Sequence, residues 1–288
     1  MRSPTESALD LDITVLRSWI GRTQLGRDIA TERLIAGLLA TFESERNFPS
    51  NARQAPLTLH WCLAPPIAPM SDLGPDGHPA RGGFLPPIPL PRRMWAGGEL
   101  EILDRIIAGD AVERSSRIAA IDLKQGRSGA LCFVGVDHEI ATPRGVAMRE
   151  RQNLVYRAAE AQPVAPPPKA PTPLAEHSLK LCADPVLLFR YSALTFNGHR
   201  IHYDRPYVTG EEHYPGLVVH GPLQAALLVE FAAELAKGKP PRRFSFRGIR
   251  PLFDGKDFFL KARRSDEDLA LWVENHDGDV TMEAKASW

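Results

Sequence analysis

The chain has 288 residues, of which 43% are hydrophobic and 24% are charged, and its 35 basic side chains balance 35 acidic ones. This length suffices for two ordinary domains or one large one, and the balanced charge supplies no overall basic field for binding nucleic acid. The three cysteines, Cys62, Cys132 and Cys182, show no clustered spacing, which predicts reduced thiols rather than disulfides or a metal site.

The first half of the chain predicts one helix followed by a series of strands. Its N-terminal residues, MRSPTESALDLD, lack the apolar core of a signal peptide, so we expect a cytoplasmic protein. Apolar residues at helical spacing predict a helix over residues 29–43. Strand-like runs follow at residues 57–63, 99–107, 111–123, 129–140 and 146–156.

Two proline-rich segments organise the chain. Residues 161–174, AQPVAPPPKAPTPL, are expected to form an extended tether between a first half, residues 1–160, and a second half, residues 175–288. Residues 64–93 form a second segment that is too long for an ordinary loop inside a compact domain. Because long ordered excursions often cover sites, we expect the first half to shape a pocket.

The second half repeats the order of the first. Pro222 suits a helix start and Gly238 a helix stop, which predicts a helix over residues 222–237. The apolar run at residues 217–236 contains too many polar positions to span a membrane comfortably. Further segments follow at residues 244–252, 257–263, 268–274 and 279–287. A helix followed by an antiparallel meander therefore occurs twice, which predicts an α+β fold.

Most of the candidate catalytic residues lie in residues 191–224, which contain four of the nine histidines. In the stretch TFNGHRIH, Asn197 and His202 bracket a turn in which Gly198 can take unusual backbone angles, so an amide and an imidazole can hold and deprotonate one water. The amide of Gly221 lies at the expected helix start, where no intrahelical acceptor uses it. It is a candidate oxyanion site.

These residues resemble a known family. Tyr191, Thr195, Asn197, His202 and Gly221 match the pattern of MaoC-like double hot-dog hydratases and dehydratases. Within that group the stretch resembles the branch of mitochondrial-type 3-hydroxyacyl-thioester dehydratases and bacterial mesaconyl-C4-CoA or itaconyl-CoA hydratases. The common pattern has an aspartate where this chain has Asn197. The resemblance implies a double hot-dog, in which two antiparallel sheets each wrap a central helix and join edge to edge.

The resemblance also implies reversible addition of water to an enoyl thioester, here a short branched dicarboxylic one. His202 would move the proton, Asn197 would position the water, and the Gly221 amide would stabilise the enolate. Coenzyme A enters as part of the substrate, and no bound cofactor is implied. A homodimer is left open, and one active site per chain is expected because the first half has no TFNGHRIH counterpart.

A free carboxylate on the substrate would need an arginine, whose planar fork pairs with it through two hydrogen bonds. Arg93, Arg200 and Arg247 are the candidates, although each could equally be an ordinary surface side chain. The full set of expected substrate-binding residues is Arg93, Trp95, Arg200, Tyr203, Tyr214, His220 and Arg247.

Other interpretations stay open. Asn197 and Gly198 are a favoured turn pair, so Asn197 could be scaffold. His199, His202 and His213 invite a metal site, but their spacing matches no standard ligand set and we expect none. An acyl-CoA thioesterase is the alternative enzyme, since hot-dog folds support both chemistries; Glu230 would be its nearest helix acid. A non-catalytic acyl-CoA-binding protein is the third.

Overall fold

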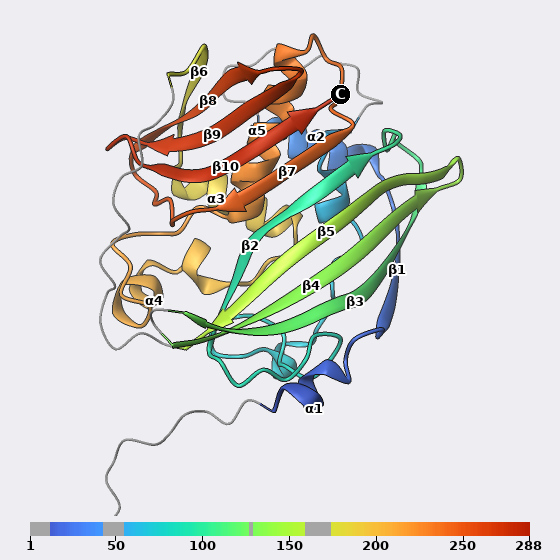
Figure 1. The fold of residues 1–288 in the computed structure, drawn as a ribbon, viewed down its shortest axis with the longest axis vertical. Helices are drawn as coiled ribbons and strands as arrows, with labels where there is room; N and C mark the ends of the chain where they lie inside the picture. The colour runs from blue at the N-terminus through green and yellow to red at the C-terminus, as the bar shows by residue number, and fades with distance from the viewer. Residues whose placement is uncertain (1–11, 43–54, 127–128, 159–173) are drawn as a thin grey trace, which may run out of the picture.

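The computed structural model describes residues 12–42, 55–126, 129–158 and 174–288. Ten strands form one sheet in the order β1-β3-β4-β5-β2-β7-β10-β9-β8-β6, and each pairing is antiparallel (Figure 1). The first five strands are β1 (Thr23–Ile29), β2 (Arg92–Ile102), β3 (Ala111–Gly126), β4 (Gly129–Thr142) and β5 (Gly145–Arg157). The others are β6 (His177–Cys182), β7 (Arg243–Gly248), β8 (Asp257–Ser265), β9 (Asp268–Asn275) and β10 (Val280–Ser287).

The helices are mostly short. They are α1 (Ile13–Arg17), α2 (Glu32–Phe42), α3 (Pro185–Leu194), α4 (Arg205–Gly210) and α5 (Gly221–Leu235), with 3-10 turns η1 (Leu59–Cys62), η2 (Met70–Asp72) and η3 (Arg200–His202). In the part of the chain that the structure describes, none of them is long and apolar enough to cross a membrane.

The two halves of the sheet join where β2 pairs with β7. At this junction Gly97 pairs with Arg247 and Gly98 with Phe246, and the β2 register shifts by a bulge between Trp95 and Gly97. A Cβ on Gly97 would collide with the Phe246 carbonyl oxygen, and Gly97 also has a φ of 155°, which disfavours other residues. The bulge and the glycine together let two curved sheets continue as one.

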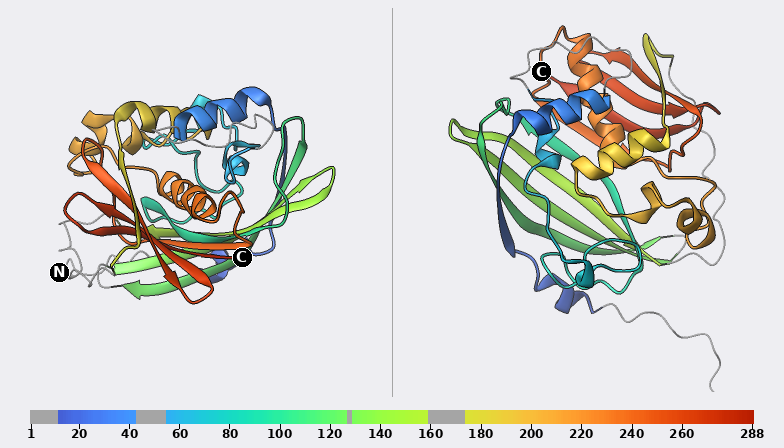
Figure 2. Two further views of the ribbon diagram at one scale, coloured as in Figure 1. Left: turned by 90° about the horizontal axis from the view of Figure 1, so that it is seen from above. Right: turned by 180° about the vertical axis from the view of Figure 1, so that it is seen from behind.

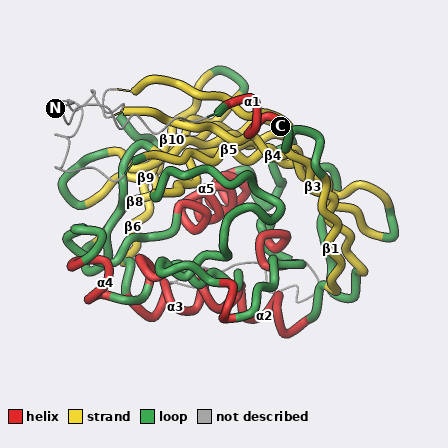
Figure 3. The backbone as a smooth tube through the Cα atoms, turned by 90° about the horizontal axis from the view of Figure 1, so that it is seen from below, coloured by secondary structure: helices red, strands yellow, loops and turns green. Residues whose placement is uncertain are grey.

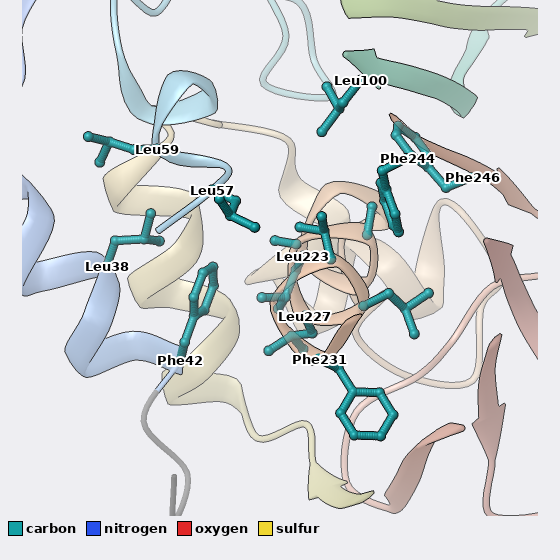
Figure 4. Close-up of a cluster of buried hydrophobic side chains, with 14 of the residues drawn as sticks. Leu38, Phe42, Leu57, Leu59, Leu100, Leu223, Leu227, Phe231, Phe244 and Phe246 are labelled. Atoms are coloured by element: carbon teal, nitrogen blue, oxygen red, sulfur yellow. The ribbon is translucent and has the colours of Figure 1, made fainter. Parts of the chain in front are cut away.

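Helix α5 is the central element of the second half. It is buried along nearly its whole length, and the strands of the second half curve around it (Figure 2). Helices α2 and α3 lie side by side on the face of α5 away from the sheet (Figure 3). Apolar side chains fill the space between these layers, as Figure 4 shows for Leu38, Phe42, Leu223, Leu227 and Phe244.

The predicted strands at residues 111–123, 129–140 and 146–156 are confirmed as β3, β4 and β5. The predicted strand at residues 57–63 is wrong, because that apolar run forms η1 and packs into the core as irregular chain. The helix predicted at residues 29–43 begins later, as α2, because Ile29 ends the edge strand β1. The proposed tether, residues 161–174, lies almost entirely outside the described residues, so the boundaries of the two halves stay predictions.

Glu230 fixes the irregular segment onto α5. Its carboxylate accepts the backbone N–H of Leu57 at 2.6 Å, in a place where both groups are buried. Replacing Glu230 with alanine should strand that N–H and lower the free energy of unfolding by about 1–3 kcal/mol. Glu267→Ala, at an exposed position in the turn between β8 and β9, should change it by less than about 0.5 kcal/mol. Equal urea midpoints for the two variants would contradict this role for Glu230.

Candidate active site

A cavity of about 1750 Å³ lies between the two halves. Its wall includes the excursion at residues 66–85, the start of β2, the segment from Tyr191 to Tyr214 and the first turn of α5, together with residues of β3, β4 and β5 and residues 248–251 from the end of β7 onward. Its lining is mainly apolar with a few convergent polar groups, as is usual for small-molecule sites. Its size suits a long ligand such as an acyl thioester of coenzyme A.

His202 ends η3 and is 7% exposed. Its Nδ1 lies 2.7 Å from the Val218 carbonyl oxygen, which can only accept, so Nδ1 carries the proton and Nε2 keeps its lone pair. Burial lowers the pKa of His202 to about 4, although the Val218 hydrogen bond opposes the shift. At neutral pH the side chain is therefore an uncharged imidazole that can accept a proton at Nε2.

His220 supports His202 from behind. The two imidazoles stack with ring centroids 3.6 Å apart and an interplanar angle of 19°. His220 is fully buried, and its Nε2 hydrogen-bonds the Ser192 hydroxyl at 2.8 Å. Burial, then the neighbouring His202 and His199, lowers the pKa of His220 well below its usual value, so the stack is uncharged. The role expected from the sequence was substrate binding, but the contacts show His220 packed beneath His202.

Asn197 lies on the cavity wall, and its side chain is already partly used. The Oδ1 atom accepts the backbone N–H of His199 at 3.0 Å, which closes a local turn. A carbonyl oxygen has a second lone pair, so Oδ1 can still accept a hydrogen bond from a water in the cavity. Both the scaffold and the water-holding interpretations of Asn197 are thus compatible with its geometry.

The special backbone angle in this turn belongs to Phe196, with a φ of 52°, and not to Gly198. Gly198 is needed for a different reason, because a Cβ there would lie 2.9 Å from the Gly77 carbonyl oxygen. Gly77, which has a φ of 84°, would likewise collide with the Gly198 carbonyl if it carried a side chain. The excursion and the turn that contains Asn197 therefore meet backbone to backbone.

Gly221 is the first residue of α5, so its N–H has no acceptor within the helix and lies at the positive end of the helix dipole. A Cβ on Gly221 would lie 3.2 Å from a ring carbon of Trp95, which closes over the helix start. Trp95 in turn stacks on Phe246 with ring centroids 4.6 Å apart. The arrangement leaves an amide donor at the helix start, and a preorganised donor of this kind can stabilise the negative charge that develops on a thioester oxygen.

The three candidate arginines have different positions. Arg93, on β2, lines the cavity next to Tyr156 on the paired strand β5. Its positive charge disfavours protonation of His78 and His199, and so adds to the effect of burial in lowering the pKa of both. Arg200 also lines the cavity, but Asp204 holds its guanidinium at 2.8 Å. Arg247 lies on the outside of β7 paired with Glu283, and the structure does not bring it to the cavity.

The two tyrosines expected to bind substrate, Tyr203 and Tyr214, both line the cavity. Tyr203 is 46% exposed and donates its hydroxyl proton to the Gly198 carbonyl oxygen at 2.9 Å. Tyr214 packs against Phe253, and the guanidinium of Arg92 lies 5.8 Å from its ring centroid. Both side chains can contact the outer part of a ligand.

Sequence reasoning missed a group of residues from the excursion. Asp76 and His78 approach His199, with the His78 and His199 ring centroids 4.0 Å apart. The sequence signal was the turn pair Pro75 and Asp76 before Gly77, but nothing in the sequence indicated which part of the chain this turn would contact.

Asp76, His78 and His199 are close enough together to be considered as metal ligands. This differs from the sequence-based set of His199, His202 and His213. The Asp76 carboxylate is engaged already, since Oδ2 accepts from His78 Nδ1 at 2.9 Å and Oδ1 from the His78 backbone N–H at 3.0 Å. The donor set that remains facing the cavity is two imidazoles, which is fewer than zinc sites in proteins use.

Substitution of Asn197 separates its two roles. Asn197→Asp keeps an acceptor for the His199 N–H and for water, so measurable turnover should remain. Asn197→Leu removes the oxygen that accepts hydrogen bonds from the His199 N–H and from water. It should reduce kcat by at least about 100-fold, as expected for loss of a group that positions the reacting water. Steady-state rates would test this, with circular dichroism as the check on folding. Wild-type rates for both variants would show that Asn197 is only scaffold.

The fold and the site fit one class of protein, the hydratases and dehydratases of acyl thioesters, with His202 as the candidate base, Asn197 as the candidate water-holding group and the Gly221 amide as the candidate oxyanion donor. The family model for hydroxyacyl-thioester dehydratase type 2 matches residues 58–254, more than half of the chain. The chain belongs to this family.

Individual relatives agree. The chain is 44% identical over 269 residues to the mesaconyl-C(4)-CoA hydratase of Chloroflexus aurantiacus, which covers 93% of this chain and 95% of that protein. It is 33% identical over 107 residues to the mitochondrial hydroxyacyl-thioester dehydratase type 2 of Schizosaccharomyces pombe, covering 36% and 35% of the two chains. These matches confirm the expected family and the expected enzyme class, a hydro-lyase.

Solved structures agree on the fold. A MaoC-like dehydratase from Phytophthora capsici aligns with a TM-score of 0.68 at 12% identity, covering 96% of this chain and 99% of that one. A Mycobacterium tuberculosis protein described as having a double hotdog fold aligns with a TM-score of 0.55 at 13% identity, covering 93% and 95%. The predicted double hot-dog is confirmed, with its two sheets continuous through β2 and β7.

Proposed function

We propose that this protein adds water reversibly to a short dicarboxylic enoyl-CoA, with mesaconyl-C4-CoA as the first candidate and itaconyl-CoA as the second. The observation that carries the proposal is the uncharged His202 imidazole, held by the Val218 carbonyl oxygen, which lines the same cavity as Gly221 at the start of α5. The relative that is 44% identical over nearly the whole chain supports the choice of substrate.

The chemistry follows from this geometry. The Asn197 amide holds the water, and His202 Nε2 takes its proton as the oxygen adds to the β carbon of the enoyl group. The electron pair moves onto the thioester carbonyl oxygen, where the Gly221 N–H stabilises it, a contribution of roughly 3 kcal/mol per donor in other enzymes. The imidazolium then returns the proton to the α carbon. Dehydration is the same path in reverse.

Arg93 supports a dicarboxylic substrate. In mesaconyl-C4-CoA the free carboxylate is attached to the β carbon, the carbon that receives the hydroxyl group, so its receptor must lie near the water site. Arg93 is the candidate arginine that lines the cavity and also acts electrostatically on His199, three residues from His202. A guanidinium at this position can pair with the carboxylate while the double bond faces His202.

The thioesterase alternative is disfavoured by Glu230. Hydrolysis would need an acidic group that activates water near the start of the helix, but the Glu230 carboxylate is buried against the Leu57 N–H and is not part of the cavity wall. A non-catalytic acyl-CoA-binding protein would not need an imidazole fixed in the tautomer that a base requires.

Initial rates with mesaconyl-C4-CoA, itaconyl-CoA and crotonyl-CoA would test the proposed substrate. We expect the highest kcat/KM with mesaconyl-C4-CoA, because an arginine left unpaired by crotonyl-CoA weakens transition-state binding. If the kcat/KM for crotonyl-CoA equals the values for both dicarboxylic thioesters, the proposed preference for a dicarboxylic substrate is wrong.

Action in the cytoplasm and assembly as a homodimer remain predictions. Cell fractionation would test the first, and the molecular mass in solution would test the second.

A further inference from the structure

The excursion of the first half packs directly against the turn that contains Asn197 and Gly198. The Asp76 carbonyl accepts the Arg200 N–H at 2.9 Å, and the Pro75 carbonyl accepts the Arg200 guanidinium at 3.0 Å. Gly77 and Gly198 add a close backbone contact that no larger residue would allow. The position of His78 is therefore fixed relative to His199 and His202, even though more than a hundred residues separate them along the chain.

His78 is held in one orientation. Asp76 Oδ2 lies 2.9 Å from His78 Nδ1, and Asp76 Oδ1 accepts the His78 backbone N–H. Burial disfavours the ionised Asp76 carboxyl, but its hydrogen bonds and the His78 charge outweigh this and keep its pKa below the usual range. An ionised Asp76 holds the proton on Nδ1, which leaves His78 Nε2 as the titrating atom.

A positively charged residue, Arg93, lines the same cavity as His78 and acts on it electrostatically. Arg93 lies near enough to His78 and His199 to disfavour protonation of both, and Arg81 adds to the effect on His78. Burial, then Arg93, lowers the pKa of His78, while Asp76 opposes the shift. His78, His199 and Arg93 all line the cavity, so an anion bound there would face one guanidinium and two imidazoles.

We propose that His78, oriented by Asp76, completes with Arg93 and His199 a receptor for the free carboxylate of a dicarboxylic acyl thioester, and that the carboxylate binds together with one proton. This inference rests on the proposed function for its ligand class. The bound carboxylate neutralises the field of Arg93, so His78 Nε2 takes up a proton and donates a hydrogen bond to the carboxylate. The His78 charge is then balanced by Asp76, and the Arg93 charge by the ligand.

The sign of the pH dependence follows. Because His78 has a higher pKa in the complex than in the free protein, carboxylate binding is strongest at low pH and weakens as the pH rises through the pKa of the complex. The charged and titratable groups around His78 are Asp76, Arg81, Arg93, His199 and His202. Of these, burial lowers the pKa of His199 to about 2 and that of His202 to about 4, so both imidazoles stay uncharged near neutral pH.

Binding of two saturated thioesters tests the receptor without any hydration chemistry. Succinyl-CoA has its carboxylate on the β carbon, and butyryl-CoA is its uncharged counterpart. Calorimetry in two buffers of different ionisation enthalpy should show uptake of close to one proton with succinyl-CoA, at about pH 7, and none with butyryl-CoA. His78→Asn should weaken succinyl-CoA binding by roughly 10- to 100-fold, the range for a hydrogen bond to a charged group, and butyryl-CoA binding far less.

Asp76→Asn is the second variant, and it should reduce proton uptake while keeping the turn, because an amide oxygen can still accept the His78 backbone N–H. His177→Asn, on the exposed part of β6, is the matched control and should behave as wild type. If His78→Asn weakens the binding of succinyl-CoA and butyryl-CoA equally, or if proton uptake persists in that variant, the proposed carboxylate receptor is wrong. So would loss of succinyl-CoA affinity on treatment with a chelator, which would indicate a metal site instead. Selective binding of succinyl-CoA without hydration of any enoyl-CoA would instead overturn only the proposed reaction.

Discussion

Replacing His202 with alanine should reduce hydration by about 100- to 10,000-fold, the usual contribution of a general acid–base group. In the proposed mechanism the same imidazole takes the proton from water and returns it to the α carbon, so no other side chain takes over either step. Stopped or continuous measurement of the absorbance of the conjugated thioester gives kcat directly. His177→Ala, at an exposed position, is the control and should keep wild-type turnover.

The pH dependence gives an independent check on His202. Its pKa of about 4 refers to the unliganded protein, and kcat/KM reports groups of the free enzyme. Because the neutral imidazole is the active form for hydration, kcat/KM should rise as the pH rises through about 4 and should show no His202 step near neutrality. Activity of His202→Ala within about threefold of wild type, or an unchanged acid limb in a residually active variant, would show that another group is the base.

Replacing Arg93 with methionine should lower kcat/KM for a dicarboxylic enoyl-CoA by roughly 10- to 100-fold more than for crotonyl-CoA. The variant keeps much of the apolar stem but loses charge-assisted hydrogen bonds, which contribute about 1.5–3 kcal/mol when a partner is charged. The useful quantity is the ratio of the two kcat/KM values, since general damage to the site lowers both together.

Arg247→Met is the matched control for Arg93→Met. Arg247 lies on the outer face of β7, where its side chain is 72% exposed and paired with Glu283, so the ratio should not change. An unaltered ratio in Arg93→Met would remove Arg93 from the carboxylate site. Arg200→Met should alter the fit of the excursion instead, because Arg200 binds Asp204 and the Pro75 carbonyl.

Much of the fold follows from local patterns. The alternating runs of β3, β4 and β5 and the proline and glycine at the ends of α5 indicated these elements because each pattern reflects the face that the element buries. The strand β1 gave no such pattern, since it lies at the edge of the sheet and is largely exposed. The apolar run at residues 57–63 was ambiguous because a short buried segment has the same composition whether it is a strand or irregular chain.

The sequence also predicts one part of the candidate site and not another. His202, Asn197 and Gly221 lie within one short stretch of sequence and could be recognised together, whereas the contacts that tune them could not. The Ser192 hydrogen bond to His220 and the approach of His78 to His199 depend on tertiary packing. The position of Arg247 was misjudged because adjacent residues on a strand point to opposite faces, and the sequence alone did not settle which face of β7 meets the cavity.

The most direct test of the central claim follows two signals from one sample of the protein with mesaconyl-C4-CoA. Hydration removes the conjugated double bond and leaves the thioester intact. The account therefore predicts loss of the enoyl-thioester absorbance with no release of free thiol, and recovery of that absorbance when the hydrated product is supplied instead. Release of thiol in step with substrate loss would make the protein a thioesterase, and binding without any change in either signal would make it a non-catalytic acyl-CoA-binding protein; either result would contradict the proposed reaction.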